Sequence, residues 1–245
     1  MLNIKKRVAL ALFSLSLGIS ANALSEISKD KLTQIQNLTL IKKANIQVKK
    51  AYDLGSLYAL DSLIQGQNQE LYLTKDTEVL IAGEAINTST GQKLSIPADV
   101  SKLAGNEAFT FGNGDDQYYL FTDPECPYCK KFESYLEQIE DEVSIKVFYY
   151  PLDFHENAKE ISLYVMSKDT KEEKTEAMIN TTKDSKEFKN RDIDEKKLAK
   201  LEKSLDKQMQ LAQELGVRGT PSIYDKNGNK ISWVKLLQDY NVEVK

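Results

Sequence analysis

The chain has 245 residues, of which 29% are charged and 41% are hydrophobic, which is ordinary for one large or two small globular domains. The formal net charge of −4 and the pI near 5.3 argue against a nucleic-acid partner, because binding to the phosphate backbone needs a basic surface. The composition also argues against a fibrous or a disordered chain.

Residues 1–23 have the pattern of a secretory signal peptide. Residues 5–7 are all basic, 8–19 form an apolar run, and 21–23 fit the small-x-small rule for cleavage. The apolar run is short for a membrane span, so an uncleaved anchor is the weaker alternative. We expect a mature chain from Leu24. It has 30 Lys and Arg and 37 Asp and Glu, which gives a net charge of −7. It is expected to have no stable membrane insertion.

The segment 24–94 is predicted to be a small domain with a helix and an antiparallel sheet. Apolar residues at helical spacing between 25 and 38 predict a helix capped by Ser25 or Ser28. A domain of about seventy residues has a marginal core, so pairing of two copies through a strand edge is expected. The expected strands, separated by polar turns, are 46–48, 57–60, 70–73 and 78–81.

A connection between two domains is predicted after the polar turn cluster at 87–91. Pro97 stands where the first turn of a helix tolerates proline, so a short helix is expected from Pro97 to Leu103. We place the linker at 95–107. A surface loop within a single domain is the alternative.

The only two cysteines of the chain, Cys126 and Cys129, form a C-x-x-C motif between a strand-like run at 118–121 and a helix-like stretch. A cysteine at the start of a helix lies beside unpaired N–H groups and the positive end of the dipole, which favours a Cys126 thiolate. Cys129, one turn further, is expected to be shielded and to serve as the resolving thiol.

Two other interpretations of the cysteine pair are weaker. A four-ligand zinc site needs more soft ligands than two cysteines and the single His155. A structural disulfide that closes so short a loop adds little stability. The spacing therefore predicts a redox-active pair that needs no metal and no cofactor.

The segment around the motif is predicted to be a strand–helix–strand unit. A strand at 108–111 and a glycine-rich turn at 112–115, read as a hairpin, precede the strand at 117–122. A further strand at 143–152 implies a parallel pair. The helix between them is expected to bury Phe132, Tyr135, Leu136 and Ile139 and to expose Lys130, Lys131, Glu133 and Glu137.

The remainder of the chain is predicted to be largely helical. Helices are expected at 157–167 and, after a highly charged solvated stretch at 171–203, along an apolar stripe that ends at Gly216. A strand follows Pro221, with a hairpin turn at 225–229 and a final helix at 233–240. Proline at the start of a strand has no N–H to donate, and its functional interpretation is a cis proline beside the dithiol.

The motifs at 122–132 (TDPECPYCKKF) and 216–221 (GVRGTP), together with the order of the segments, resemble the DsbC/DsbG family of bacterial periplasmic disulfide isomerases. The resemblance implies an α+β chain in which 24–94 is an N-terminal cystatin-like dimerisation domain. A linker helix at 95–107 then leads to an α/β thioredoxin-fold domain at 108–245, which contains a helical insertion.

The resemblance also implies roles for residues of the site. Cys126 is the attacking nucleophile and Cys129 the resolving thiol of a redox-active disulfide. A Thr–cis-Pro loop packs against this disulfide and offers backbone groups to an extended substrate. The residues of that loop and of the segment between the cysteines are Thr220, Pro221, Pro127 and Tyr128. The family forms V-shaped homodimers joined by their N-terminal domains.

Three functional hypotheses follow for a periplasmic protein of this kind. The first is a disulfide isomerase or reductase that acts on misoxidised exported proteins and is kept reduced by a membrane electron donor. The second is an oxidase that donates its disulfide and passes electrons to an acceptor. The third is a dimeric holdase chaperone. His155 either tunes the dithiol or is a surface or helix-start histidine, since no spacing ties it to Cys126.

Overall fold

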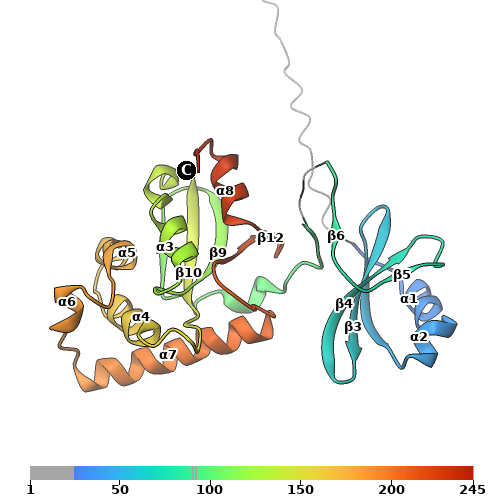
Figure 1. Cartoon of the computed structure of the whole chain (residues 1–245), viewed down its shortest axis with the longest axis horizontal. Helices are drawn as coiled ribbons and strands as arrows, with labels where there is room; N and C mark the ends of the chain where they lie inside the picture. The colour runs from blue at the N-terminus through green and yellow to red at the C-terminus, as the bar shows by residue number, and fades with distance from the viewer. Residues whose placement is uncertain (1–24, 90, 92, 245) are drawn as a thin grey trace, which may run out of the picture.

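The computed structural model describes residues 25–89, 91 and 93–244, so the predicted signal peptide lies outside the described residues. Figure 1 shows an N-terminal and a C-terminal lobe joined by one stretch of chain. Within the part that is described, no helix is both long and apolar enough to cross a membrane.

The N-terminal lobe contains the predicted helical segment followed by the predicted antiparallel sheet. The sheet order is β1-β2-β3-β4-β5, and every neighbouring pair is antiparallel. A side hairpin, β6 and β7, follows it. The elements are β1 (Ser25–Glu26), α1 (Lys29–Gln36), α2 (Thr39–Lys43), β2 (Gln47–Asp53), β3 (Leu57–Ile64), β4 (Gln67–Thr74), β5 (Leu80–Ile81), β6 (Ala85–Ile86) and β7 (Lys93–Leu94).

The predicted helix at 25–38 is shorter and divided. Ser28 is its N-cap, because its hydroxyl accepts a hydrogen bond from the Lys31 N–H at 3.3 Å, whereas Ser25 lies in β1. Asn37 ends α1 as its C-cap, and α2 starts again at Thr39. Ile35 and Ile41, one from each helix, are fully buried against the sheet.

The predicted linker helix is reduced to one 3₁₀ turn, η1 (Val100–Leu103). The prediction that it starts at Pro97 was wrong because the Ala98 N–H donates to the Gly228 carbonyl at 2.8 Å, which holds this part extended. The Asp99 carboxylate then accepts from the Ser101 N–H at 3.1 Å and starts the turn. Val100 and Leu103 are buried in the core of the C-terminal domain.

The C-terminal sheet has the order β12-β11-β9-β10-β8. Its one parallel pair is β9 with β10, as the strand–helix–strand prediction requires, and β11 and β12 form the predicted hairpin. The strands are β8 (Phe109–Phe111), β9 (Asp116–Thr122), β10 (Val143–Tyr149), β11 (Ser222–Asp225) and β12 (Lys230–Ile231).

The predicted hairpin across 112–115 was wrong, because β10 lies between β8 and β9. The glycine-rich turn crosses the start of β10, where the Gly114 N–H donates to the Val143 carbonyl at 2.9 Å. A Cβ on Gly112 would lie 2.1 Å from the same carbonyl oxygen. The two glycines therefore serve this close backbone approach.

Helices and turns cover both faces of this sheet. One face packs against α3, α4, α5 and α8, and the other against η1 and the end of α7. In Figure 1 the insertion helices α4, α5 and α6 gather at one side, and α7 runs below them. The elements are α3 (Pro127–Glu133), η2 (Leu136–Ile139), α4 (Ala158–Met166), α5 (Lys171–Asn180), α6 (Lys186–Lys189), α7 (Glu195–Glu214) and α8 (Trp233–Asp239).

The ends of two helices, α3 and α7, can be compared with the predictions. The helix expected to continue from the dithiol through Ile139 instead stops at Glu133, and η2 follows as a separate 3₁₀ turn. Gly216 follows α7 with φ of +74°, the left-handed conformation in which glycine ends a helix without steric cost.

Candidate active site

The dithiol lies where the central strand β9 gives way to α3. Cys126 is the N-cap of α3, and its N–H donates to the Asp123 carbonyl at 3.0 Å across the preceding turn. Pro127 occupies the first turn of the helix, where a missing N–H costs nothing. Cys126 is 6% exposed and Cys129 is fully buried, and both are free thiols.

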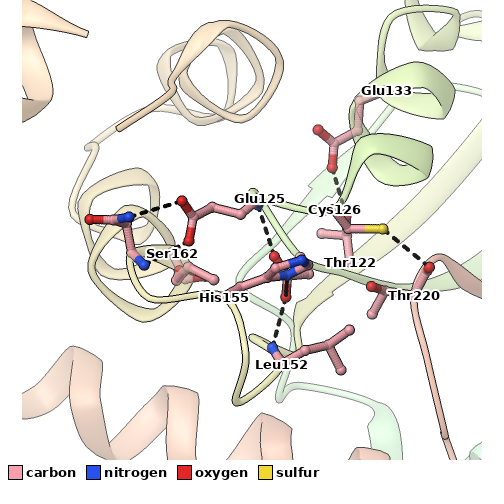
Figure 2. Close-up of polar contacts among 11 residues, drawn as sticks. Thr122, Glu125, Cys126, Glu133, Leu152, His155, Ser162 and Thr220 are labelled. Atoms are coloured by element: carbon pink, nitrogen blue, oxygen red, sulfur yellow. Dashed lines mark hydrogen bonds and ion pairs between the residues drawn. The ribbon is translucent and has the colours of Figure 1, made fainter. Parts of the chain in front are cut away.

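The environment of Cys126 favours its thiolate. A hydrogen bond from the Cys129 thiol lowers its pKa most, and the backbone N–H groups of Tyr128 and Cys129 add to this effect. Burial opposes them, but the net pKa is about 5. When protonated, the Cys126 thiol donates to the Thr220 carbonyl at 3.3 Å (Figure 2). The charged sulfur is therefore stabilised mainly by donors of its own helix turn, and the Thr220 side chain lowers the pKa further.

Cys129 has the opposite character. Burial raises its pKa far above the ordinary thiol value, and the hydrogen bond to Cys126 and the charge of Glu133 raise it further. A thiol of this kind is protonated at neutral pH and cannot attack a disulfide until a base takes its proton.

A buried acid, Glu133, lies one helical turn beyond Cys129. It is 1% exposed, and its Oε1 accepts a hydrogen bond from the Thr122 hydroxyl at 2.6 Å (Figure 2). Burial raises the pKa of Glu133 to about 7, while Lys130 and the Thr122 hydroxyl oppose the rise. Glu133 can therefore exchange a proton near neutral pH.

The prediction that Lys130 and Glu133 lie on the exposed face of the helix was wrong. Glu133 follows Cys129 by four positions, and such pairs share a helix face. That spacing was the available signal for its position beside the dithiol. Lys130 is drawn in after it, with its Nζ 3.7 Å from Glu133 Oε2 and its side chain 23% exposed.

The Thr220–Pro221 segment forms the opposite wall of the site. Its peptide bond is cis. The next residue, Ser222, pairs with Phe121 at the end of β9 in antiparallel register. This pairing brings the Thr220 carbonyl to the Cys126 sulfur across 94 positions of sequence.

A second buried carboxylate, Asp123, organises the loop before Cys126. It is fully buried and accepts hydrogen bonds from the Glu125 N–H at 2.8 Å and the Leu152 N–H at 2.7 Å. It also lies 2.8 Å from Nδ1 of His155. His155, which sequence spacing left unconnected to the dithiol, is thus linked to the active-site turn (Figure 2).

The loop after β10 is held to the active-site turn at a second point. The Glu125 carboxylate accepts from the backbone N–H of Asn157 at 2.6 Å and from its side-chain amide at 3.0 Å. Asp123 follows β9, and His155 and Asn157 follow the parallel strand β10. The carboxyl ends of parallel strands meet at one edge of a sheet, which was the sequence signal for this cluster.

Two aromatic side chains stand in solvent on this part of the domain. Tyr128, between the cysteines, is 66% exposed, and Phe154, on the loop that carries His155, is 75% exposed. Across the residues that the structure describes, no three His, Cys, Asp or Glu side chains gather as metal ligands.

A cysteine with a depressed pKa, a shielded second thiol and a buried acid that titrates near pH 7 together define the site of a thiol:disulfide oxidoreductase. Residues 111–235, just over half of the chain, match the family model described as a thioredoxin-like domain. The chain therefore belongs to the thioredoxin-like domain family, and the predicted thioredoxin-like domain is confirmed.

The chain is also similar to several solved structures. For the catalytic domain of Proteus mirabilis ScsC, identity is 20% and the TM-score 0.38, over 56% of this chain and 89% of that one. For alpha-DsbA2 of Wolbachia pipientis the values are 19%, 0.43, 58% and 92%. For Helicobacter pylori DsbG they are 14%, 0.38, 81% and 100%. No curated protein matches the sequence significantly.

Proposed function

We propose that this protein is a periplasmic thiol:disulfide interchange protein that isomerises or reduces the disulfides of misoxidised exported proteins. The observation that carries the proposal is the opposite tuning of two adjacent thiols, with the pKa of Cys126 about 5 and that of Cys129 raised by burial. One thiol is charged and ready to attack, and the other is held in reserve.

The first step is attack of the Cys126 thiolate on a substrate disulfide. A Cys126–substrate S–S bond forms, the substrate S–S bond breaks, and its electron pair leaves with one substrate sulfur, which takes a proton from water. In isomerisation, a substrate thiolate then attacks the substrate sulfur of this mixed disulfide, forms a new substrate disulfide and restores the Cys126 thiolate. No net oxidation or reduction has occurred.

In reduction, Cys129 completes the reaction. Its thiol proton passes to the Glu133 carboxylate, its sulfur attacks the Cys126 sulfur, and the substrate leaves as a second thiolate. The substrate has gained two electrons, and Cys126 and Cys129 now form a disulfide. Return to the dithiol needs two electrons from outside, for which we propose a membrane electron donor.

Glu133 suits this step because its proton affinity changes with the state of Cys126. The negative charge of Cys126 raises the pKa of Glu133, and this charge disappears when Cys126 enters a mixed disulfide. The pKa of Glu133 then falls. The carboxyl group therefore becomes a carboxylate, and hence a base, in the intermediate from which Cys129 must lose its proton.

Substrate is proposed to bind along the wall formed by Thr220 and Pro221, in contact with Pro127 and Tyr128. The Thr220 carbonyl lies beside the attacking sulfur, so an extended peptide placed there brings its disulfide to Cys126. The exposed ring of Tyr128 offers apolar surface next to it.

Replacement of Cys126 by Ser is predicted to abolish the refolding of a scrambled disulfide-bonded protein, because no other described thiol is poised to attack. The matched variant, Cys129→Ser, should retain attack and accumulate mixed disulfides that survive denaturing gel electrophoresis. Activity retained by Cys126→Ser would contradict the proposal and favour a holdase. A pair found oxidised at rest in cells would favour the oxidase.

We further propose that 24–94 is a dimerisation domain, 95–107 the linker and 108–245 the catalytic domain. The strand β5 pairs only with Tyr72 and Leu73, so residues 67–71 of β4 lie at the outer edge of the sheet. At the other end of β4 the Thr74 N–H donates to the Val79 carbonyl at 3.1 Å, and Val79 is 53% exposed there. An edge strand with apolar surface is suited to pairing with a second copy.

The mature chain is predicted to sediment as a homodimer. Val79→Asp should weaken the dimer at least about tenfold, because it puts a charge at an apolar contact. The matched control is Phe154→Asp, which replaces an even more exposed apolar residue in the other domain and should leave the dimer intact. Sedimentation velocity over a range of concentrations tests both, and an equal effect of the two changes would contradict this placement of the interface.

A further inference from the structure

Lys130 links the active-site helix to the helical insertion. It directly follows Cys129, and its Nζ donates to the Met178 carbonyl at 2.6 Å and to the Thr181 carbonyl at 3.2 Å. The same nitrogen lies 3.7 Å from Glu133 Oε2. One ammonium group therefore contacts both the insertion and the buried acid beside the dithiol.

The two carbonyls belong to the end of α5. This helix stops at Asn180, with Thr181 as its C-cap, and the last carbonyls of a helix have no partner within it. No basic residue of α5 itself lies in its last turn. Lys130 supplies the missing donor and places a positive charge at the negative end of the helix dipole.

The charges and polar groups around Glu133 come from three elements. Among the groups with the largest effects on the pKa of Glu133, only Lys130 is positively charged. Its effect is to lower the pKa of Glu133, whereas burial and the Cys126 charge raise it. The groups facing Glu133 are Lys130, Cys126 and Cys129 on α3, the Thr122 hydroxyl on β9 and Tyr149 on β10.

We propose that Lys130 is a positioning residue through which the helical insertion controls the base Glu133. The end of α5 holds the ammonium group at a set distance from the carboxylate. This inference rests on the proposed function, since it concerns the proton that Cys129 gives up in the resolving step. The insertion thereby acts on the chemistry through Lys130.

The test follows the resolving step by itself. Glutathione is placed on Cys126 as a mixed disulfide, and its release by Cys129 is timed between pH 5 and pH 9. In wild-type protein the rate should rise with the ionisation of Glu133, and Glu133→Gln should slow the release. In Lys130→Met the pH midpoint of this rate increase should move upward by about one pH unit or more, because the positive charge of Lys130 no longer stabilises the Glu133 carboxylate.

Lys131→Met is the matched control, because Lys131 is the neighbouring lysine and its side chain is exposed. It should leave the midpoint unchanged, and Lys130→Arg should restore most of it. Hydrogen exchange supplies a second readout. The Thr181 amide, which donates to Ala177 at the end of α5, should exchange about tenfold faster in Lys130→Met than in Lys131→Met. Lys130→Gln gives a folded neutral variant if the Met variant loses structure.

A midpoint in Lys130→Met and Lys130→Gln equal to that in Lys131→Met would overturn the proposal. So would a shifted midpoint with unchanged exchange at the end of α5, since the insertion would then have no part in it. Failure of the wild-type protein to release glutathione at any pH is a different outcome. It would contradict the proposed function, whereas the exchange measurement would still decide whether Lys130 caps α5.

Discussion

Cys126 in the reduced, folded protein is expected to react with iodoacetamide as a thiolate, with a midpoint at about pH 5. The reactive form is lost as the pH falls through this value and is complete above it. At pH 7 an ordinary thiol is only about 3% ionised, whereas one with a pKa of about 5 is about 99% ionised. The thiolate fraction available at neutral pH is therefore raised roughly thirtyfold.

Mass spectrometry of the alkylated cysteines checks this expectation site by site. Cys129 should stay unmodified over the same range, since burial, the hydrogen bond to Cys126 and the charge of Glu133 raise its pKa. Cys129→Ala removes the thiol whose hydrogen bond lowers the pKa of Cys126 most. In this variant the pH midpoint of Cys126 alkylation should therefore lie higher than in the wild type. A wild-type midpoint near pH 8.5 would contradict the account of the site.

The low pKa also bears on the direction of electron flow. Ionisation of Cys126 stabilises the dithiol form and leaves the disulfide form unaffected, so it raises the reduction potential of the pair. This contribution is present above the ordinary thiol pKa and shrinks as the pH falls toward 5. A stable dithiol suits an isomerase that rests in the reduced state, and the same raised potential makes the disulfide form a stronger oxidant, as an oxidase needs.

Asp123→Ala is expected to lower the free energy of unfolding of the reduced protein by about 3 kcal/mol or more. The lost carboxylate is fully buried and accepts from Glu125 and Leu152 and contacts His155. Two backbone N–H groups and one ring nitrogen would be left without this partner, and each stranded donor costs about 1–3 kcal/mol. The turn that carries Cys126 would lose its main support.

Urea denaturation at pH 7 measures the effect. Asp153→Ala is the matched control, because Asp153 lies on the same loop with its side chain exposed, and its loss should cost within about 0.5 kcal/mol. Asp123→Asn keeps one oxygen acceptor and should fall between the two. Equal midpoints for Asp123→Ala and Asp153→Ala would show that the buried carboxylate does not support the loop.

Local sequence patterns were sufficient for much of this protein. The C-x-x-C pair after an apolar run and before a helix predicted a strand, a dithiol at the helix start and a parallel neighbour, and β9, α3 and β10 have this arrangement. Alternation and turn residues predicted the antiparallel sheet of the N-terminal domain. Such features depend on neighbours within a few residues, so the sequence carries them directly.

Tertiary structure decided the electrostatics and the strand order. The glycines at 112 and 114 predicted a hairpin turn, but the chain at these positions passes close to the backbone of β10, where a side chain would not fit. Glu133 was predicted to be exposed, but it is buried, with a hydrogen bond from Thr122 and an ion pair with Lys130. Asp123 and His155 are brought together by the pairing of two strands. The C-x-x-C spacing alone determined that the chain carries a dithiol, while contacts between distant segments determined the pKa of each thiol, because burial and charge act through space.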